Sequence, residues 1–260
     1  MDILNNVKNL IIIGTIAFLT TTCSLPTDPG PQPKDIIETE FEPGYNILGV
    51  LRNDGTAGSS FIRVEEAFKL TEITDEFTPV VEGVTVQLRE ESAAETTQFT
   101  LTEDSLRGKI YSAPSFQPEA CAKYSLTITG SDLPDVTGEV VVPGSPMLDS
   151  ASVSISGNTV NFTLEEVPGI ALYEIYLICE KATVSVRRFP AHSGEINISI
   201  NYSGTAGSPQ SLEIYGYESN MMEYITAPIT IKPQTYRETV TTVSGGYGVF
   251  GAVSKMVYQF

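Results

Sequence analysis

Residues 171–180 read ALYEIYLICE, and this stretch sets the fold class of the chain around it. Up to its last residue, Glu180, it is apolar on both faces of an extended strand except at Glu174. Strands that are apolar on both sides are typical of the middle of a sheet, where other layers cover them from both faces. The stretch therefore predicts a central β-strand.

Shorter runs with a two-residue period surround this stretch within residues 145–230. Apolar and polar residues alternate in four of them, at 160–165, 184–189, 196–201 and 212–217. Alternation of this kind predicts strands that are buried on one face. We expect a β-sandwich whose strand spacing resembles that of a fibronectin type III domain.

The same period dominates residues 44–144. Strands are predicted at 45–51, 61–73, 84–88, 97–101, 109–112, 124–129 and 139–142. The run at 61–73 also fits one helical face through Val64 and Phe68, but we favour a strand because its neighbours are strands. These runs predict a first β-sandwich, immunoglobulin-like or transthyretin-like, that ends at the turn-prone junction 142–146. The chain is thus predicted to be all-β, with two tandem β-sandwich domains.

The final segment, residues 231–260, is a glycine-rich tail that contains GGYGVFGA at 245–252. Glycines among large apolar residues predict a strand or bulge that another backbone approaches closely. The run lacks the Lys, the Ser or Thr and the helix pattern of a phosphate-binding loop. We expect it to contact a partner protein through Gly245, Gly246, Tyr247, Gly248, Phe250 and Gly251.

The N-terminal segment has the three parts of an export signal. Lys8 precedes an apolar run at 10–19, and small residues lead to Cys23. The apolar run is too short to cross a bilayer, which takes about 20 residues. The pattern resembles a bacterial lipoprotein signal, with residues 1–22 removed and Cys23 carrying acyl chains. The alternative is an ordinary secretory cleavage that falls near a Cys.

Residues 23–43 follow as a lipidated Cys and a proline-rich tether, a composition that favours an extended spacer. Fatty chains on Cys23 would place the protein on a membrane. The formal net charge of −17 disfavours nucleic acid and anionic lipid surfaces as partners, because both would repel the chain. Cys121 and Cys179 lie in apolar alternating runs, so we expect two buried free thiols.

No pattern in the sequence predicts catalysis. His192 is the sole histidine, and no nucleophile motif accompanies it, so we interpret it as an exposed turn residue. Acidic pairs occur, for example Glu65-Glu66 and Glu165-Glu166, but adjacent residues of a strand point to opposite faces. A hydrolase with two carboxylates from different strands remains the competing hypothesis.

Metal and sugar sites are also not predicted. Too few Cys and His residues are present for a zinc site, and the twelve-residue calcium loop pattern is absent. There is no Trp, and the tyrosines alternate within strands, which favours packing over a glycan site. We therefore expect no cofactor, no metal and no enzymatic activity, and the ligand is left open.

Three stretches resemble the Bacteroidota outer-membrane lipoproteins known as the domain of unknown function 4249 family. They are Cys23 with its tether, the early strand YNILGVL at 45–51, and the run 245–252. The resemblance implies a lipoprotein of the outer membrane without an assigned activity, placed beside a receptor of the TonB-dependent class. The sequence thus predicts a non-catalytic binding or accessory module, with an adhesin as a further alternative.

Overall fold

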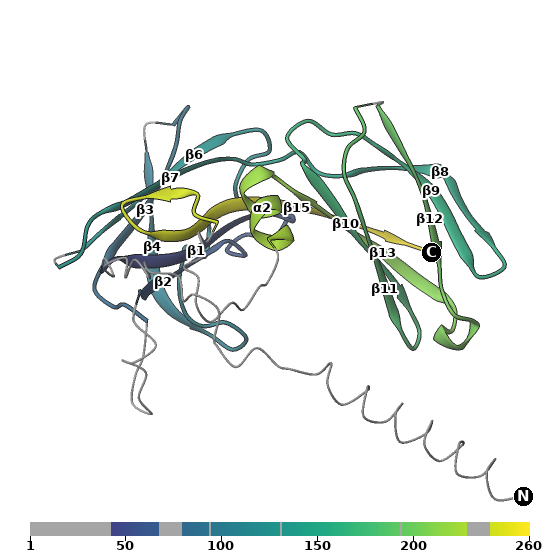
Figure 1. Ribbon diagram of the computed structural model, residues 1–260, viewed down its shortest axis with the longest axis horizontal. Coiled ribbons are helices and arrows are strands. Elements are labelled where there is room, and N and C mark those ends of the chain that lie inside the picture. The colour runs from purple at the N-terminus through teal and green to yellow at the C-terminus, as the bar shows by residue number, and fades with distance from the viewer. Residues whose placement is uncertain (1–42, 68–79, 94, 131, 193, 228–239) are drawn as a thin grey trace, which may run out of the picture. The chain divides into compact units, whose positions relative to one another are not determined.

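In the computed structural model, which describes residues 43–67, 80–93, 95–130, 132–192, 194–227 and 240–260, the regular structure is mostly β-strand with one short α-helix (Figure 1). The signal, Cys23 and most of the tether lie outside the described residues. Among the residues that are described, no helix has the length and apolar character needed to cross a bilayer.

The strands before the junction form one sheet that folds over on itself. They are β1 (Tyr45–Asn53), β2 (Phe61–Glu66), β3 (Thr85–Glu90), β4 (Thr96–Asp104), β5 (Gly108–Ser112), β6 (Lys123–Thr129) and β7 (Val136–Val141). The first half of β4 pairs with β3 and its second half pairs with β5, so this strand joins the two layers. The favoured strand at the start of 61–73 is confirmed by β2, and residues 68–73 lie outside the described ranges.

The first core lies between these layers. Fully buried apolar side chains point inward from strands of both layers, among them Leu51, Ile62, Leu88, Phe99 and Leu126. The alternating burial follows the sequence period, as in β6, where every second residue is buried. Phe250, far away in the sequence, belongs to the same core.

The strands after the junction lie in two sheets. They are β8 (Met147–Ser156), β9 (Thr159–Glu165), β10 (Leu172–Cys179), β11 (Thr183–Arg188), β12 (Glu195–Asn201) and β13 (Pro209–Tyr217). The three-stranded sheet has the order β12-β9-β8, and the other strands join the larger sheet in the order β11-β10-β13-β15. Side chains from both sheets form a second core.

β10 is the predicted central strand, and it lies between β11 and β13. Tyr173, Ile175 and Leu177 fill the second core from one of its faces. On the other face Glu174 is buried, and Arg187 Nε and the Tyr217 hydroxyl donate to its carboxylate at 2.7 and 3.0 Å. The buried charge of Glu174 inside β10 is therefore tolerated, because both of its carboxylate oxygens have donors.

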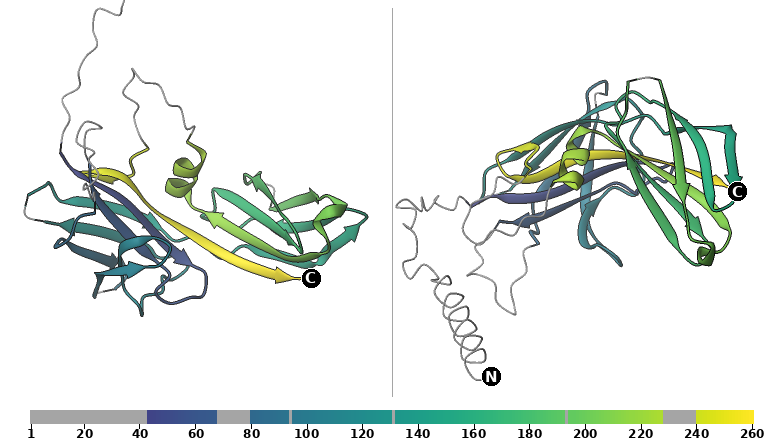
Figure 2. Two further views of the ribbon diagram at one scale, coloured as in Figure 1. Left: turned by 90° about the horizontal axis from the view of Figure 1, so that it is seen from below. Right: turned by 45° about the vertical axis from the view of Figure 1, so that its right-hand side comes forward.

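The C-terminal strand β15 (Tyr247–Gln259) belongs to both sets of strands. Residues 247–254 pair in parallel with β1, and residues 253–259 pair antiparallel with β13. In Figure 2 it is the yellow arrow that leaves β1 and runs into the second set. The short β14 (Val243–Ser244), which precedes β15 in the sequence, pairs with β7. The tail is thus a strand, as the glycine pattern predicts, and it makes one sheet of twelve strands.

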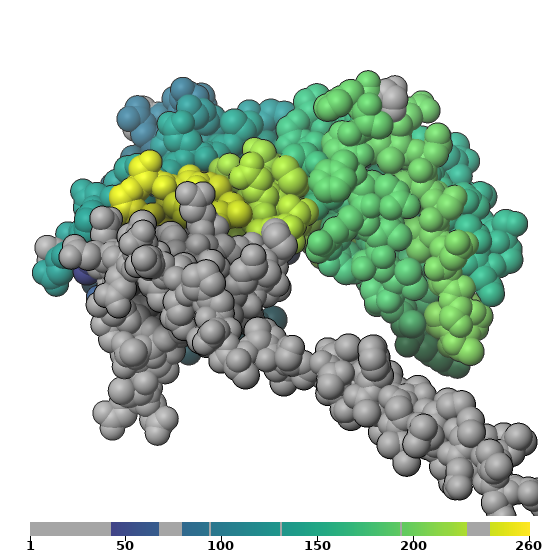
Figure 3. Space-filling model, in the orientation of Figure 1, coloured from purple at the N-terminus to yellow at the C-terminus, as the bar shows by residue number. Residues whose placement is uncertain are grey.

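The helix α2 (Ser219–Thr226) was not predicted. It follows β13 directly, and Met221 and Ile225 on one of its faces pack with Val249 and Val253 of β15. Figure 3 shows its yellow-green surface against the yellow end of the chain. A 3₁₀ turn, η2 (Gly204–Ala206), precedes β13.

The two described thiols are free but differ in burial. Cys179 ends β10 and is buried, and burial raises the pKa of its thiol. The prediction of burial is wrong for Cys121, which is exposed. Cys121 lies in the turn before β6 with a φ of 63°, so its side chain is outside the alternation that directs side chains into the core.

Candidate functional site

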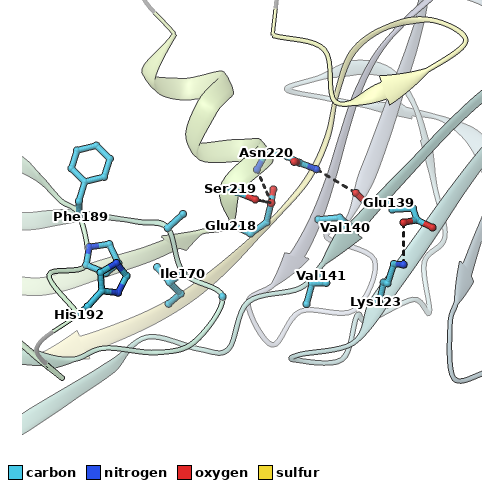
Figure 4. A pocket seen from close by; sticks show the side chains of 13 residues that line it. Lys123, Glu139, Val140, Val141, Ile170, Phe189, His192, Glu218, Ser219 and Asn220 are labelled. Atoms are coloured by element: carbon cyan, nitrogen blue, oxygen red, sulfur yellow. Dashed lines mark hydrogen bonds and ion pairs between the residues drawn. The ribbon is translucent and has the colours of Figure 1, made fainter.

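A cleft of about 710 Å³ opens beside the start of α2 (Figure 4). One wall consists of Lys123 and residues 139–141 of β7, and the other consists of the loop 169–171 with Phe189, Pro190 and His192 after β11. Glu218, Ser219 and Asn220 lie between the walls. The cleft thus joins residues from five separate stretches of the sequence.

The polar groups of the β7 wall are paired. Lys123 Nζ lies 3.0 Å from Glu139 Oε2, and this hydrogen bond raises the pKa of Lys123. Asn220 Nδ2 donates to the backbone oxygens of Glu139 at 3.3 Å and Phe250 at 2.9 Å. Asn220 therefore ties β7, α2 and β15 together at the base of the cleft.

Glu218 caps α2, and its side chain also accepts a hydrogen bond from an amide of β15 that has no strand partner on that side. Its Oε1 accepts from the Met221 and Ala252 amides at 2.8 and 3.1 Å, and its Oε2 accepts from the Asn220 amide at 2.7 Å. The Ala252 amide needs this acceptor because β13 ends at Tyr217, one residue before Glu218. Burial raises the pKa of Glu218, although the hydrogen bonds oppose the shift.

The rim of the cleft exposes apolar side chains. Phe189 is 59% exposed on one wall and Val141 is 47% exposed on the other. Figure 4 shows Phe189 and His192 on the side opposite Lys123 and Glu139. Large apolar groups at the mouth of a cleft with a few fixed polar groups are the usual surroundings of a binding site.

Among the described residues that line the cleft, no acidic or nucleophilic side chain is hydrogen-bonded to His192. This residue is exposed, with a φ of 57°, in the turn predicted for it. Of the two cleft carboxylates, Glu139 is paired with Lys123, and both oxygens of Glu218 accept backbone amides. Within the described ranges, no cluster of three or more His, Cys, Asp or Glu side chains could hold a metal ion.

The tyrosines considered for sugar binding pack on one another. Tyr176 and Tyr217 lie on either side of Tyr215, with ring centroids 5.7 and 6.4 Å from it, on the face of β10 and β13 away from the second core. Tyr173 is fully buried, and its hydroxyl accepts from the Val167 amide at 2.9 Å. The predicted packing role is confirmed for these four residues, whereas the fifth tyrosine considered, Tyr224, lies on α2 and is 45% exposed.

The predicted contact residues of the tail make contacts within the chain. Phe250 is fully buried in the first core, and Gly251 lies under Met221 of α2. Gly246 and Gly248 lie against the backbone of β1. Gly245 is exposed, and Gly246, Tyr247 and Gly248 are half-buried. The other predicted site residue, Cys23, is outside the described residues.

Sequence reasoning missed Glu218, Asn220 and the apolar rim. Glu is not among the preferred N-cap residues, so Glu218 does not indicate the start of a helix. The pair Ser219-Asn220 after an alternating strand is a start signal that could have indicated α2. Phe189 follows an alternating strand, and only the fold shows that it faces a cleft.

Comparisons with known proteins assign no family to the chain. No protein-family model and no characterised protein sequence matches the chain. Among solved structures, the chain is similar to the FN1–FN3 domains of chicken CNTN1, with 11% sequence identity and a TM-score of 0.19. The match covers 82% of this chain and 65% of that chain. A TM-score this low carries no inference about function.

Proposed function

We propose that the protein is a non-catalytic binding module, held on the bacterial outer membrane by acyl chains on Cys23, that contacts another envelope protein through the cleft beside α2. The observation that carries this proposal is the exposure of Phe189 and Val141 on opposite walls of that cleft. Aromatic side chains at the centre of an interface contribute a large part of the binding energy. The resemblance to the outer-membrane lipoproteins makes a TonB-dependent receptor the first candidate partner.

The proposal also assigns the two sets of strands to known architectures. The three-plus-four order of β12-β9-β8 and β11-β10-β13-β15 supports a fibronectin type III-like sandwich for the second set. The folded-over sheet supports an immunoglobulin-like or transthyretin-like sandwich for the first. Domains of this kind commonly serve as binding and spacing modules.

The experiment is a pull-down of the lipidated protein from solubilised outer membrane, with two exposed apolar residues changed in parallel. Phe189→Ser alters the cleft rim, and Leu106→Ser alters a residue that is 91% exposed in the turn between β4 and β5. Both changes should alter stability by less than about 0.5 kcal/mol. We expect Phe189→Ser to reduce capture of a stoichiometric partner roughly tenfold or more, and Leu106→Ser to leave it unchanged.

Recovery of the protein alone, or equal capture by both variants, would count against the cleft as the contact surface. Membrane attachment has its own test, in which Cys23→Ser should release the protein from the membrane fraction. Retention of this variant on the membrane would overturn the lipid anchor and leave the cleft untouched.

A hydrolase that uses two carboxylates from different strands is the second candidate. Under this alternative, the protein hydrolyses a glycan or peptide panel, and changing one acidic pair abolishes that hydrolysis. The binding proposal predicts no hydrolysis by the unchanged protein.

A further inference from the structure

Among the described strands, the two sheets end in four edge strands, and only one of these is unprotected. Sheet edges carry backbone groups that can pair with another chain, and proteins usually block them with charges, irregular pairing, Pro or short length. β11 carries Arg187 and Arg188, β14 has two residues, and the pairing of β8 is irregular between Asp149 and Ser154. β12 has seven residues in unbroken register with β9, and it contains no Pro, Lys or Arg.

The open side of β12 presents a regular row of backbone groups. The Tyr202 amide donates to Asn158 O, and the Glu166 amide donates to Gly194 O, so the even-numbered residues of this segment bond to β9. In an antiparallel ladder the residues between them direct their amides and carbonyls the other way. The amides of Asn197, Ser199 and Asn201 therefore face the open edge, where no strand of the described chain pairs with β12.

The exposed face of β12 carries a repeated side-chain pair. Three times in succession, an Asn lies directly opposite a Ser or Thr of β9 or β12, and the hydroxyl donates to the Asn Oδ1. The pairs are Thr159 with Asn201 at 2.6 Å, Ser199 with Asn161 at 2.6 Å, and Thr163 with Asn197 at 2.9 Å. Cross-strand pairs of this kind stabilise antiparallel sheets.

We propose that two copies of the chain associate through β12, antiparallel about a twofold axis at Ile198, into one six-stranded sheet. In this register Asn197 lies opposite Ser199 of the partner subunit, which repeats the Asn–Ser pair already formed with β9. Ile196 lies opposite Ile200 of the partner subunit on the buried face. Glu195 lies opposite Asn201 of the partner subunit, so no like charges meet, and the outward-facing amides meet outward-facing carbonyls.

A standard interface involves about 20 to 30 residues from each partner. β12 supplies only seven residues, so pairing through this strand alone makes a smaller interface. The dimer should therefore be weak, with a dissociation constant in the micromolar range or above. Attachment of both copies to one membrane would raise their effective concentration and favour the pair.

The test uses the purified full-length chain in detergent and measures its mass by sedimentation across the micromolar range. Ser199→Pro removes an amide that faces the open edge and leaves the bonds to β9 in place. Ser199→Ala loses the same hydroxyl and keeps the amide, so it is the matched control. We expect Ser199→Pro to weaken association roughly tenfold or more, and Ser199→Ala to dimerise. A thermal melt confirms that both are folded.

The register has a separate test in two double variants. N197K/S199E places a lysine of each copy opposite a glutamate of the other and should still dimerise. N197K/S199K places lysines opposite each other and should stay monomeric. Equal behaviour of the two would rule out the register centred on Ile198.

Residue-resolved hydrogen exchange decides whether a second copy is the occupant. The amides of Asn197, Ser199 and Asn201 should gain protection as the concentration rises, while that of Ile198 is protected throughout. Fast exchange of the three at every concentration would overturn the proposal, as would protection that arises in dilute protein or only after adding envelope extract.

Discussion

The two halves of β15 lie in one strand but are held in different ways. The half that pairs with β1 carries Gly248, the fully buried Phe250 and Gly251, and its fit depends on close backbone contact. The half that pairs with β13 carries half-exposed side chains, with Lys255 Nζ 2.9 Å from Glu213. The first half should therefore tolerate almost no change, and the second should tolerate many.

The largest effect should come from Gly248→Val in the first half. Gly248 has a φ of 93°, and an added Cβ would overlap Ile47 O of β1. We expect a loss of about 5 kcal/mol in the free energy of unfolding, or no folded protein, in chemical denaturation.

A matched control separates the cost of a side chain at positive φ from the cost of the overlap with β1. Gly55→Val has the same kind of φ, 77°, but meets nothing within 4 Å, so it should cost only about 1–3 kcal/mol. Equal losses in the two variants would mean that the approach of β15 to β1 is not the constraint.

The next effect compares one large side chain from each half. Phe250→Ala removes a ring from the first core and should cost about 3–5 kcal/mol. Met256→Ala changes a partly buried residue at the second core and should cost about 1–2 kcal/mol. Denaturant unfolding of both variants measures the difference, and a larger loss for Met256→Ala would reverse the comparison.

Glu218→Ala tests the point where the two halves meet. It leaves the amides of Asn220, Met221 and Ala252 without their acceptor, so we expect a loss of about 2–3 kcal/mol. Hydrogen exchange should show faster exchange at Ala252 and in α2, and unchanged exchange in β3 and β6. Uniform exchange throughout the chain would contradict a local role.

Two carboxylates, Glu218 just after β13 and Glu213 within it, should respond to pH in opposite directions. Burial raises the pKa of Glu218 above its ordinary 4.5, so its contribution to stability is present below pH 4.5 and is lost as pH rises through the folded pKa. Burial also acts on Glu213, but hydrogen bonds from Lys255 and Tyr215 keep its pKa below 4.5. Its contribution is present above pH 4.5 and is lost as pH falls.

The measurement is the free energy of unfolding of the unchanged protein minus that of each Gln variant, across the acid range. The difference for Glu218→Gln should fall as pH rises, and the difference for Glu213→Gln should fall as pH falls. Slopes of the same sign would contradict these assignments.

The sequence predicts the strands well and their long-range pairing poorly. Two-residue alternation depends only on which face is buried, so it locates β9, β12 and β13 directly, and the run that is apolar on both faces locates β10. β8 was not predicted because most of its residues are exposed. α2 was not predicted because its N-cap is a Glu, which is not a typical start signal. The glycines of β15 indicate that a backbone comes close, but only the fold identifies β1 on one side and β13 on the other.

The smallest effect should come from Val257→Thr in the second half. Val257 is 45% exposed, and Thr keeps the branched shape that suits a strand, so stability should change by less than about 0.5 kcal/mol. The same substitution at Val249, which is fully buried under α2 in the first half, places a hydroxyl among apolar groups and should cost about 1–3 kcal/mol. Denaturant midpoints measured side by side compare one chemical change at two places in one strand. Equal losses would mean that β15 is constrained uniformly along its length.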